Sequence, residues 1–321
     1  MQSGPTWATV EKMIKLSLLA LFAAGLSLAE IHNHPGSPNP LPHDKYIRVV
    51  SEAVSPVERL YIKTRDGLYV AAALRKPKGD GPFPVLIHVH GAPGGRGMDQ
   101  LVGWVLGTTG GPVWERFLQE GFVVVSADYR GGPFPRGDGF KRDDITYLDD
   151  GLAVLDYVRS LPFVDKSNIN LYGVSLGGDV VMHMLGRTSV HAAILGAPAP
   201  INFLGATFGK SADRWKDVHL DEDLARRNIE PVQTPILILV GTADSLINLD
   251  RPLHEMLSKA GKTVNMEVYE HGYHDFCMGP QGQKGRDEPL LDSTLAALET
   301  SVRFVKANQE VKPGTSGSVQ D

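Results

Sequence analysis

Short runs rich in apolar residues recur along the middle of the chain. They cover residues 84–89, 121–127, 168–172, 192–195, 235–240 and 264–269. A strand that is apolar at every position is buried on both faces, which is typical of a parallel sheet covered by helices. Two further strands, at residues 59–63 and 69–74, are expected to form an antiparallel hairpin joined at Asp66-Gly67. The pattern therefore predicts a mostly parallel sheet of about eight strands.

Between these runs, apolar residues recur at helical spacing. Such segments cover residues 147–160, 176–185, 251–260 and 290–305. Alternating strands and helices with short connections predict an α/β fold with a doubly wound sheet and helices on both faces. Residues 197–232 interrupt this rhythm, and we expect them to form a small cap at the edge where such sheets bind ligands. Phe203, Phe208 and Trp215 would then line an apolar pocket, whereas ordinary aromatic packing in a surface excursion is the alternative.

The two ends of the chain differ in composition from its middle. Lys12 and Lys15 precede an apolar run at residues 16–28 that ends beside Ala29, which is the pattern of a secretory signal peptide. The run is shorter than the roughly 20 residues of a membrane span, so we expect cleavage after Ala29, with Met13 as an alternative start. The predicted organisation is a signal peptide at 1–29, an extended segment at 30–55, a folded domain at 56–308 and a flexible tail at 309–321. A periplasmic or secreted bacterial protein is expected, with no stable membrane insertion once the signal is removed.

The sequence Gly173-Val174-Ser175-Leu176-Gly177 lies between a predicted strand and a predicted helix. A strand, a sharp turn and a helix are the context in which the serine of a G-x-S-x-G motif acts as a nucleophile. Outside that context the motif would be weak evidence, because a chain with 35 glycines contains such patterns by chance. In this context, Ser175 is the predicted nucleophile.

A serine hydroxyl attacks efficiently when a histidine takes its proton and an acidic residue orients that histidine. Asp244 follows the strand at 235–240, and His274 follows the strand at 264–269. Because parallel strands end at one edge of a sheet, both side chains are expected near Ser175, in the chain order Ser, Asp, His. Two alternatives remain open, namely Asp250, whose place at a helix start is typical of a cap, and His271, which precedes His274 in the same loop.

Acyl transfer also needs hydrogen-bond donors for the oxyanion. The backbone N–H of Leu176, directly after the nucleophile, is one candidate. The second is expected in the glycine-rich segment that begins at His90, after the strand at 84–89. Ala92 is the candidate there because Pro93 has no N–H.

The charged residues and the cysteine content restrict the remaining possibilities. Lysines and arginines are spread along the chain and the net charge is −5, so there is no reason to expect binding to nucleic acid. The single cysteine, Cys277, cannot form an intrachain disulfide and is expected to pack near the site. His88 and His90 alternate on one strand, but no acidic or cysteine partner completes a metal site. We therefore predict neither a metal nor an organic cofactor.

Taken together, these motifs resemble those of a known family. The segments that carry the resemblance are His90-Gly91-Ala92-Pro93, Asp128-Tyr129-Arg130-Gly131-Gly132, Gly173-Val174-Ser175-Leu176-Gly177-Gly178, Gly241-Thr242-Ala243-Asp244 and His274-Asp275-Phe276. Their order is similar to that in the catalytic domain of prolyl oligopeptidase-type serine hydrolases, and also resembles dienelactone-hydrolase-like and acetyl-xylan-type esterases. The resemblance implies an α/β-hydrolase fold over roughly residues 59–305.

Two departures from that family matter. Residues 30–58 are expected to be too few for the N-terminal propeller of the oligopeptidases. Asp179 stands where the related proteins more often have an apolar or aromatic residue, and the sequence assigns it no role.

These observations predict a serine hydrolase that cleaves carboxylic esters through an acyl-enzyme, with a small-molecule ester or a short peptide as substrate. A small exported peptidase acting on short peptides or aminoacyl amides is the alternative. The acid pairs Asp143-Asp144 and Asp149-Asp150 leave open a site for a peptide amino terminus. A non-catalytic binding protein of the same fold is a third possibility, although such proteins usually lack a member of the triad.

Overall fold

The structure, a computed structural model, describes residues 55–65, 67, 69–107, 113–129, 144–210, 214–278 and 292–309. The predicted signal peptide, extended segment and C-terminal tail lie almost wholly outside these residues, as do Arg130, Gly131, Gly132 and Asp143. Among the described helices, none combines the length and the apolar character that a membrane crossing requires.

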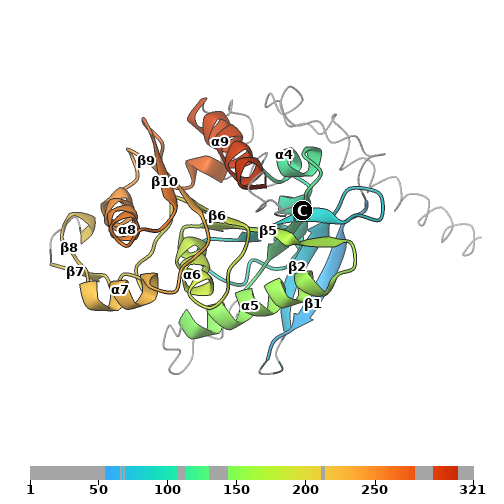
Figure 1. The fold of residues 1–321 in the computed structure, drawn as a ribbon, viewed down its shortest axis with the longest axis horizontal. Coiled ribbons are helices and arrows are strands. Elements are labelled where there is room, and N and C mark those ends of the chain that lie inside the picture. The colour runs from blue at the N-terminus through green and yellow to red at the C-terminus, as the bar shows by residue number, and fades with distance from the viewer. Residues whose placement is uncertain are drawn as a thin grey trace, which may run out of the picture.

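An eight-stranded sheet runs through the centre of the molecule (Figure 1). Its strands are β1 (Glu58–Lys63), β2 (Tyr69–Arg75), β3 (Phe83–Val89), β4 (Val123–Ala127), β5 (Val164–Val174), β6 (Ala192–Gly196), β9 (Ile236–Gly241) and β10 (Val264–Tyr269). They lie in the order β1-β2-β4-β3-β5-β6-β9-β10. The β1–β2 and β2–β4 pairs are antiparallel, and the other neighbouring pairs are parallel. The predicted sheet is therefore confirmed.

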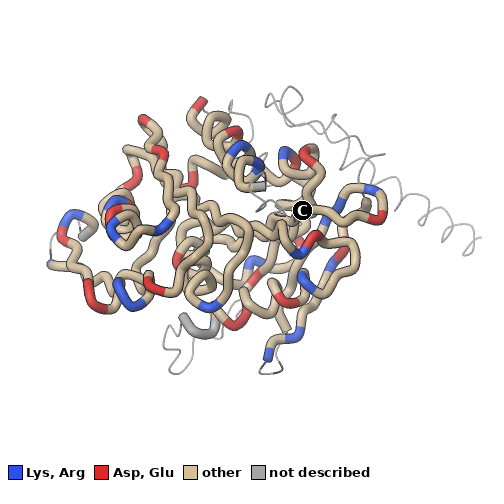
Figure 2. Tube along the Cα trace, in the orientation of Figure 1, with Lys and Arg blue, Asp and Glu red and all other residues tan. Residues whose placement is uncertain are grey.

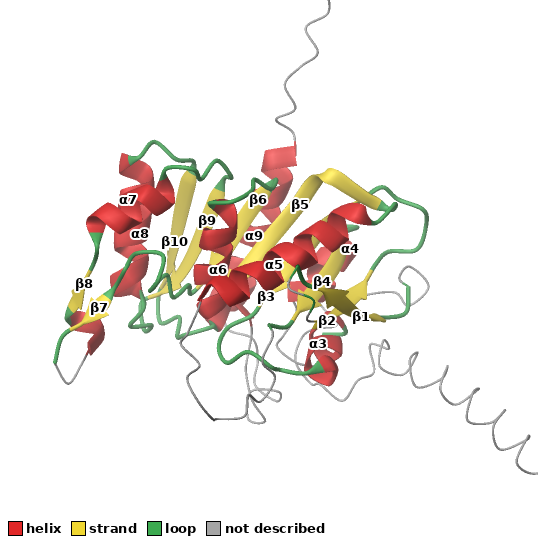
Figure 3. Ribbon diagram, turned by 90° about the horizontal axis from the view of Figure 1, so that it is seen from below, coloured by secondary structure: helices red, strands yellow, loops and turns green. Residues whose placement is uncertain are grey.

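Helices cover both faces of the sheet (Figure 3). One face packs against α5 (Asp144–Ser160), α6 (Leu176–Leu185) and α8 (Ile247–Lys259), and the other against α3 (Met98–Val105), α4 (Val113–Gln119) and α9 (Asp292–Gln309). Within β3, Val85 and Ile87 belong to the first core and Leu86 to the second. Because successive strand residues enter opposite cores, apolar residues stand on both faces of the strand. This confirms the predicted doubly wound α/β fold.

The insertion after β6 contains a two-stranded hairpin and a helix. The hairpin pairs β7 (Thr207–Phe208) with β8 (Val218–His219), and α7 (Glu222–Ile229) follows it. In two perpendicular views the hairpin lies at the end of the molecule beside α7 and α8 (Figures 1 and 3). A role of residues 197–232 as a cap stays a prediction.

Candidate active site

The turn between β5 and α6 holds Ser175 in an unusual backbone conformation. Its φ of 52° and ψ of −120° lie in a region that residues other than glycine rarely adopt and that costs of order 1–3 kcal/mol. The flanking glycines allow the turn, because a Cβ on Gly173 would lie 2.5 Å from the carbonyl oxygen of Gly177, and a Cβ on Gly177 would collide with the carbonyl of Val89. The structure therefore gives Ser175 the strained turn that a nucleophile elbow requires.

His274 joins Ser175 to Asp244 through the two nitrogens of its ring. Its Nε2 lies 3.0 Å from Ser175 Oγ, and its Nδ1 lies 2.8 Å from Asp244 Oδ2. The other oxygen of Asp244 accepts a hydrogen bond from the backbone N–H of Leu246 at 3.0 Å, which fixes the carboxylate. The three side chains follow β5, β9 and β10, and they come together at the carboxyl edge of the parallel strands. Both distances are within the reach that a nucleophile–base–acid relay needs.

The alternative acid and base do not join this arrangement. His271 is exposed and its backbone N–H donates to Thr242 Oγ1 at 2.8 Å. Asp250 is buried in the first turn of α8, whereas the hydrogen bond of His274 Nδ1 is made with Asp244. Burial, followed by the charge of Asp244, raises the pKa of Asp250 well above its usual value. A carboxyl group with a raised pKa holds its proton more strongly, which makes it a poorer partner for an imidazolium.

The surroundings of His274 favour its protonated form. Burial lowers the pKa of the imidazole, but the hydrogen bond to Asp244 and the charges of Asp275 and Asp244 together raise it above the ordinary value of 6.5. A base that holds its proton more strongly is a better acceptor for the serine proton once it has been deprotonated. The cost is that a larger fraction of His274 is already protonated near neutral pH.

The glycine-rich segment after β3 lies directly against the serine. A Cβ on Gly91 would be 3.0 Å from Ser175 Cβ and 3.6 Å from Ser175 Oγ. This close approach brings the segment that carries Ala92 next to the nucleophile. Within the described residues, no protein acceptor is found for the backbone N–H of Ala92 or of Leu176, so both can donate to a substrate oxygen.

Asp128 organises this segment, a role that sequence reasoning did not find. Its Oδ1 accepts hydrogen bonds from the N–H of Gly95 at 2.8 Å and lies 3.1 Å from His90 Nε2, and its Oδ2 accepts from the N–H of Gly97 at 2.8 Å. Burial raises the pKa of Asp128, but these hydrogen bonds outweigh it and lower the pKa from 3.8 to about 2. The side chain of Tyr129 adds a hydrogen bond to the carbonyl of His90 at 2.9 Å. The available sequence signal was the Asp128-Tyr129 pair at the end of a strand.

His88 and His90 have structural roles, because both contact side chains of the neighbouring strand and its end. His88 is buried, with Nδ1 2.9 Å from Ser126 Oγ, while His90 contacts Asp128. Across the described ranges, no group of three or more His, Cys, Asp or Glu side chains is placed to hold a metal ion.

The structure corrects the predicted role of Phe203. Its side chain is only 1% exposed and packs against the ring of His183, with centroids 5.3 Å apart, so it belongs to the core and does not line an open pocket. The reason is Asp179, whose carboxylate accepts hydrogen bonds from the backbone N–H groups of Asn202 and Phe203 at 3.1 and 2.9 Å. Asp179 thereby fixes the segment after β6 against α6 and turns Phe203 inward.

The other two aromatic residues predicted for the pocket contact each other. Phe208 and Trp215 pack edge to face in the insertion, with ring centroids 5.0 Å apart. Their contact with a substrate stays a prediction. Cys277 is fully buried, and burial raises the pKa of its thiol to about 12, so it has the packing role expected from its position.

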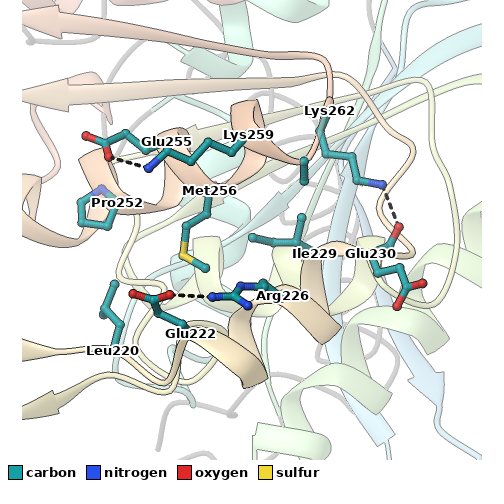
Figure 4. Close-up of a pocket in the computed structure, with 11 residues that line it drawn as sticks. Leu220, Glu222, Arg226, Ile229, Glu230, Pro252, Glu255, Met256, Lys259 and Lys262 are labelled. Carbon is teal, nitrogen blue, oxygen red and sulfur yellow. Dashed lines mark hydrogen bonds and ion pairs between the residues drawn. The ribbon is translucent and has the colours of Figure 1, made fainter.

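A separate pocket of about 530 Å³ lies between α7 and α8 (Figure 4). Ile229 and Met256 line it, together with the ion pair Arg226–Glu222 at 2.7 Å. Charges of both signs occur along these two helices (Figure 2), and two ion pairs, Arg226–Glu222 and Lys259–Glu255, line the pocket. None of Ser175, Asp244 and His274 lines this pocket, so it is not part of the site that they form.

The chain is similar in sequence to a known protein family and to a curated protein. A model of the prolyl oligopeptidase family matches residues 114–292, more than half of the chain and a range that includes Ser175, Asp244 and His274. The quorum-quenching protein AidA of Acinetobacter baumannii is 29% identical over 126 residues, which cover 39% of this chain and 38% of that protein. The matched stretch thus spans well under half the length of this relative.

Two solved structures are similar at lower identity. An esterase from the archaeon Pyrobaculum calidifontis is 19% identical, with a TM-score of 0.56 over 80% of this chain and 85% of the esterase. The acylaminoacyl peptidase of Pyrococcus horikoshii is 18% identical, with a TM-score of 0.58 over 80% of this chain and 42% of the peptidase. Both likenesses concern the fold.

Proposed function

Since the chain belongs to the prolyl oligopeptidase family and has the α/β-hydrolase fold, we propose that it is an exported serine hydrolase that cleaves carboxylic esters. One observation carries the proposal. A single imidazole, that of His274, lies 3.0 Å from Ser175 Oγ and 2.8 Å from Asp244 Oδ2, at the edge of the sheet where ligands of such folds bind. This is the geometry that a serine nucleophile needs.

The proposed reaction has two halves. Ser175 Oγ forms a bond to the ester carbonyl carbon while its proton passes to His274 Nε2, and the carbonyl oxygen becomes an oxyanion. The imidazolium then gives that proton to the leaving alcohol oxygen as the carbon–oxygen bond of the ester breaks. In the second half a water molecule repeats the sequence on the acyl-enzyme and releases the acid. Asp244 keeps the Nδ1 proton of His274 in place throughout.

The backbone at Leu176 and Ala92 supplies the electrostatic part of the proposal. The N–H of Leu176 directly follows Ser175, and the backbone beside Ala92 approaches the Ser175 side chain at Gly91. The Asp128 hydrogen bonds hold the Ala92 segment in shape before substrate arrives. A preorganised donor of this kind is typically worth a factor of about 10²–10³ in kcat.

A peptidase is the second candidate, because the family is named for peptidases and the acylaminoacyl peptidase has a similar fold. Binding of a free peptide amino terminus usually requires carboxylates that share an open site. Of the pair Asp149-Asp150, Asp150 is fully buried, so the two do not face solvent together. This observation favours the ester over the peptide.

Export is supported by the sequence at residues 12–29, where a basic segment precedes an apolar run. Expression of the full chain in a bacterium, followed by mass determination of the mature amino terminus, tests it. A mature chain that begins at Glu30 and is recovered from the periplasm or the medium supports export. An uncleaved chain in the cytoplasm contradicts it.

The substrate class is tested by rates on p-nitrophenyl acetate and on aminoacyl p-nitroanilides at equal concentration. The proposal predicts a larger kcat/KM on the ester, and faster cleavage of the anilide would favour the peptidase. A fluorophosphonate probe addresses the third possibility, since a non-catalytic binding protein would leave Ser175 unlabelled.

A further inference from the structure

A second carboxylate lies on the reacting side of His274. Asp275 Oδ1 is 3.3 Å from His274 Nε2, which is the nitrogen that faces Ser175 Oγ. We propose that Asp275 is a positioning residue that stabilises the His274 imidazolium from this side, as Asp244 does from the other. The inference rests on the proposed function, because it assigns a role within the same proton transfer.

The backbone is shaped to bring Asp275 there. Side chains of adjacent residues in an extended loop normally point apart, whereas Asp275 has a φ of 63°. This left-handed conformation folds its carboxylate back toward the ring of the preceding residue. Aspartate and asparagine are among the few residues with a Cβ that adopt it readily. The turn thus uses a residue type that is compatible with the strain and also carries the charge.

The burial of the carboxylate indicates what it is paired with. Asp275 Oδ1 is out of contact with solvent and has no hydrogen-bond partner among the described residues. An ionised oxygen in such a place is costly unless a cation lies beside it. His274 is the titratable group in contact with it, so the imidazolium is the ion that offsets the burial.

Among the described residues, two other charged groups act on Asp275. Asp244 approaches from the loop after β9, and Arg96 acts on Asp275 from the segment before α3. Burial and Asp244 raise the pKa of Asp275, while His274 and Arg96 lower it, and the balance is a raised pKa. The two charges support each other, because His274 lowers the pKa of Asp275 and Asp275 raises the pKa of His274.

This arrangement has a distinctive kinetic consequence. The imidazolium exists in the protonated free enzyme and again in the transition state, after the Ser175 O–H bond has broken and the Nε2–H bond has formed. Asp275 takes no proton in either state and acts by its charge. Its loss should raise the free energy of both states by a similar amount. The acidic pKa of the kcat/KM profile should then fall, and the plateau above it should fall by the factor that corresponds to this shift.

The test is the pH profile of kcat/KM for Asp275→Asn, which removes the charge and tolerates the left-handed backbone. From the usual effect of a nearby charge, we expect the acidic pKa to fall by about one unit and the plateau to fall about tenfold. Rates on the acidic limb should then coincide with those of the wild type. Asp275→Gly, which also tolerates the positive φ, should give the same profile and decides the matter if the first variant folds poorly.

The matched control is Glu267→Gln, an exposed carboxylate on β10 whose loss makes the same change in net charge. It should leave the profile unchanged. A parallel fall of the Asp275→Asn profile at all pH values with an unchanged pKa would show a purely structural role and overturn the inference, as would a profile equal to that of the wild type.

A second readout separates this inference from the proposed substrate class. The rate of Ser175 labelling by a fluorophosphonate depends on the same His274 proton transfer and needs no ester substrate. If the protein cleaves no ester but its labelling rate shows the paired fall of pKa and plateau in Asp275→Asn, the role of Asp275 holds and the esterase proposal fails. If esters are cleaved and the labelling pKa does not move, the role of Asp275 fails alone.

Discussion

The carboxylate of Asp128 lies 3.1 Å from His90 Nε2 and ties the end of β4 to the segment that approaches Ser175. The same carboxylate accepts three backbone N–H hydrogen bonds, from Gly95, Gly97 and Tyr129. A buried anion with this many donors is a structural centre for the segment that carries the Ala92 amide.

Replacing Asp128 by Asn should therefore loosen the oxyanion side of the site. The amide keeps one acceptor oxygen and loses the charge, so we expect a loss of about 1–3 kcal/mol in the free energy of unfolding. We also expect a fall in kcat with little change in the acidic pKa. Urea unfolding and steady-state kinetics measure the two effects, and an Asn variant of wild-type stability and kcat would contradict this role.

The stability of the fold should depend on the ionisation of Asp128. Its folded pKa of about 2 lies below the ordinary value of 3.8, so its contribution is fully present above about pH 4–5 and is lost as the pH falls toward 2. The difference corresponds to about 2 kcal/mol. The gap in unfolding free energy between the wild type and Asp128→Asn should shrink over this range, and a gap that is constant from pH 6 to the lowest accessible pH would contradict the assignment.

The activity should have an acidic limb set by His274. Because its pKa is raised above 6.5 and only the neutral imidazole accepts the serine proton, kcat/KM should fall as the pH is lowered through a midpoint above 6.5. A pH–rate profile on a neutral ester, whose own ionisation does not change, measures this midpoint. A midpoint at or below 6.5 would mean that the carboxylates around His274 do not act as the geometry indicates.

Asp179 should matter for stability more than for proton transfer. It holds the backbone N–H groups of Asn202 and Phe203, and Asp179→Ala would leave them buried without an acceptor. We expect a loss of about 2–4 kcal/mol in the free energy of unfolding. The acidic midpoint of kcat/KM should not move, and a shifted midpoint with unchanged stability would contradict the role.

Much of the fold could be predicted because its causes are local. The central strands are mainly apolar since both of their faces are buried, and the Asp66-Gly67 pair in the sequence marked the hairpin of β1 and β2. The helix that became α8 was expected four residues late, because Pro252 lies within it and obscured its start at Ile247. The short helices α3, α4 and α7 were missed, since 7 or 8 residues give too few turns for a clear period.

The residues of the candidate site fall into two groups, those that the sequence identifies and those that it does not. Ser175, Asp244 and His274 could be identified because each follows a strand of one parallel sheet, so topology alone brings them to one edge. Asp128 and Asp179 could not, because their partners lie at Gly95 and Phe203, and nothing near either aspartate in the sequence specifies those contacts. The prediction for Phe203 was wrong for that reason.

One paired measurement tests whether Ser175 is the nucleophile of an ester hydrolase. Wild-type protein and Ser175→Ala are treated with a fluorophosphonate probe and assayed on p-nitrophenyl acetate, with Ser245→Ala, at a serine on the loop beside Asp244, as the matched control. We expect labelling and hydrolysis in the wild type and the control, no labelling in Ser175→Ala, and a fall in kcat of at least about 10³-fold in that variant. Wild-type rates in a folded Ser175→Ala, or labelling that persists in it, would contradict the account.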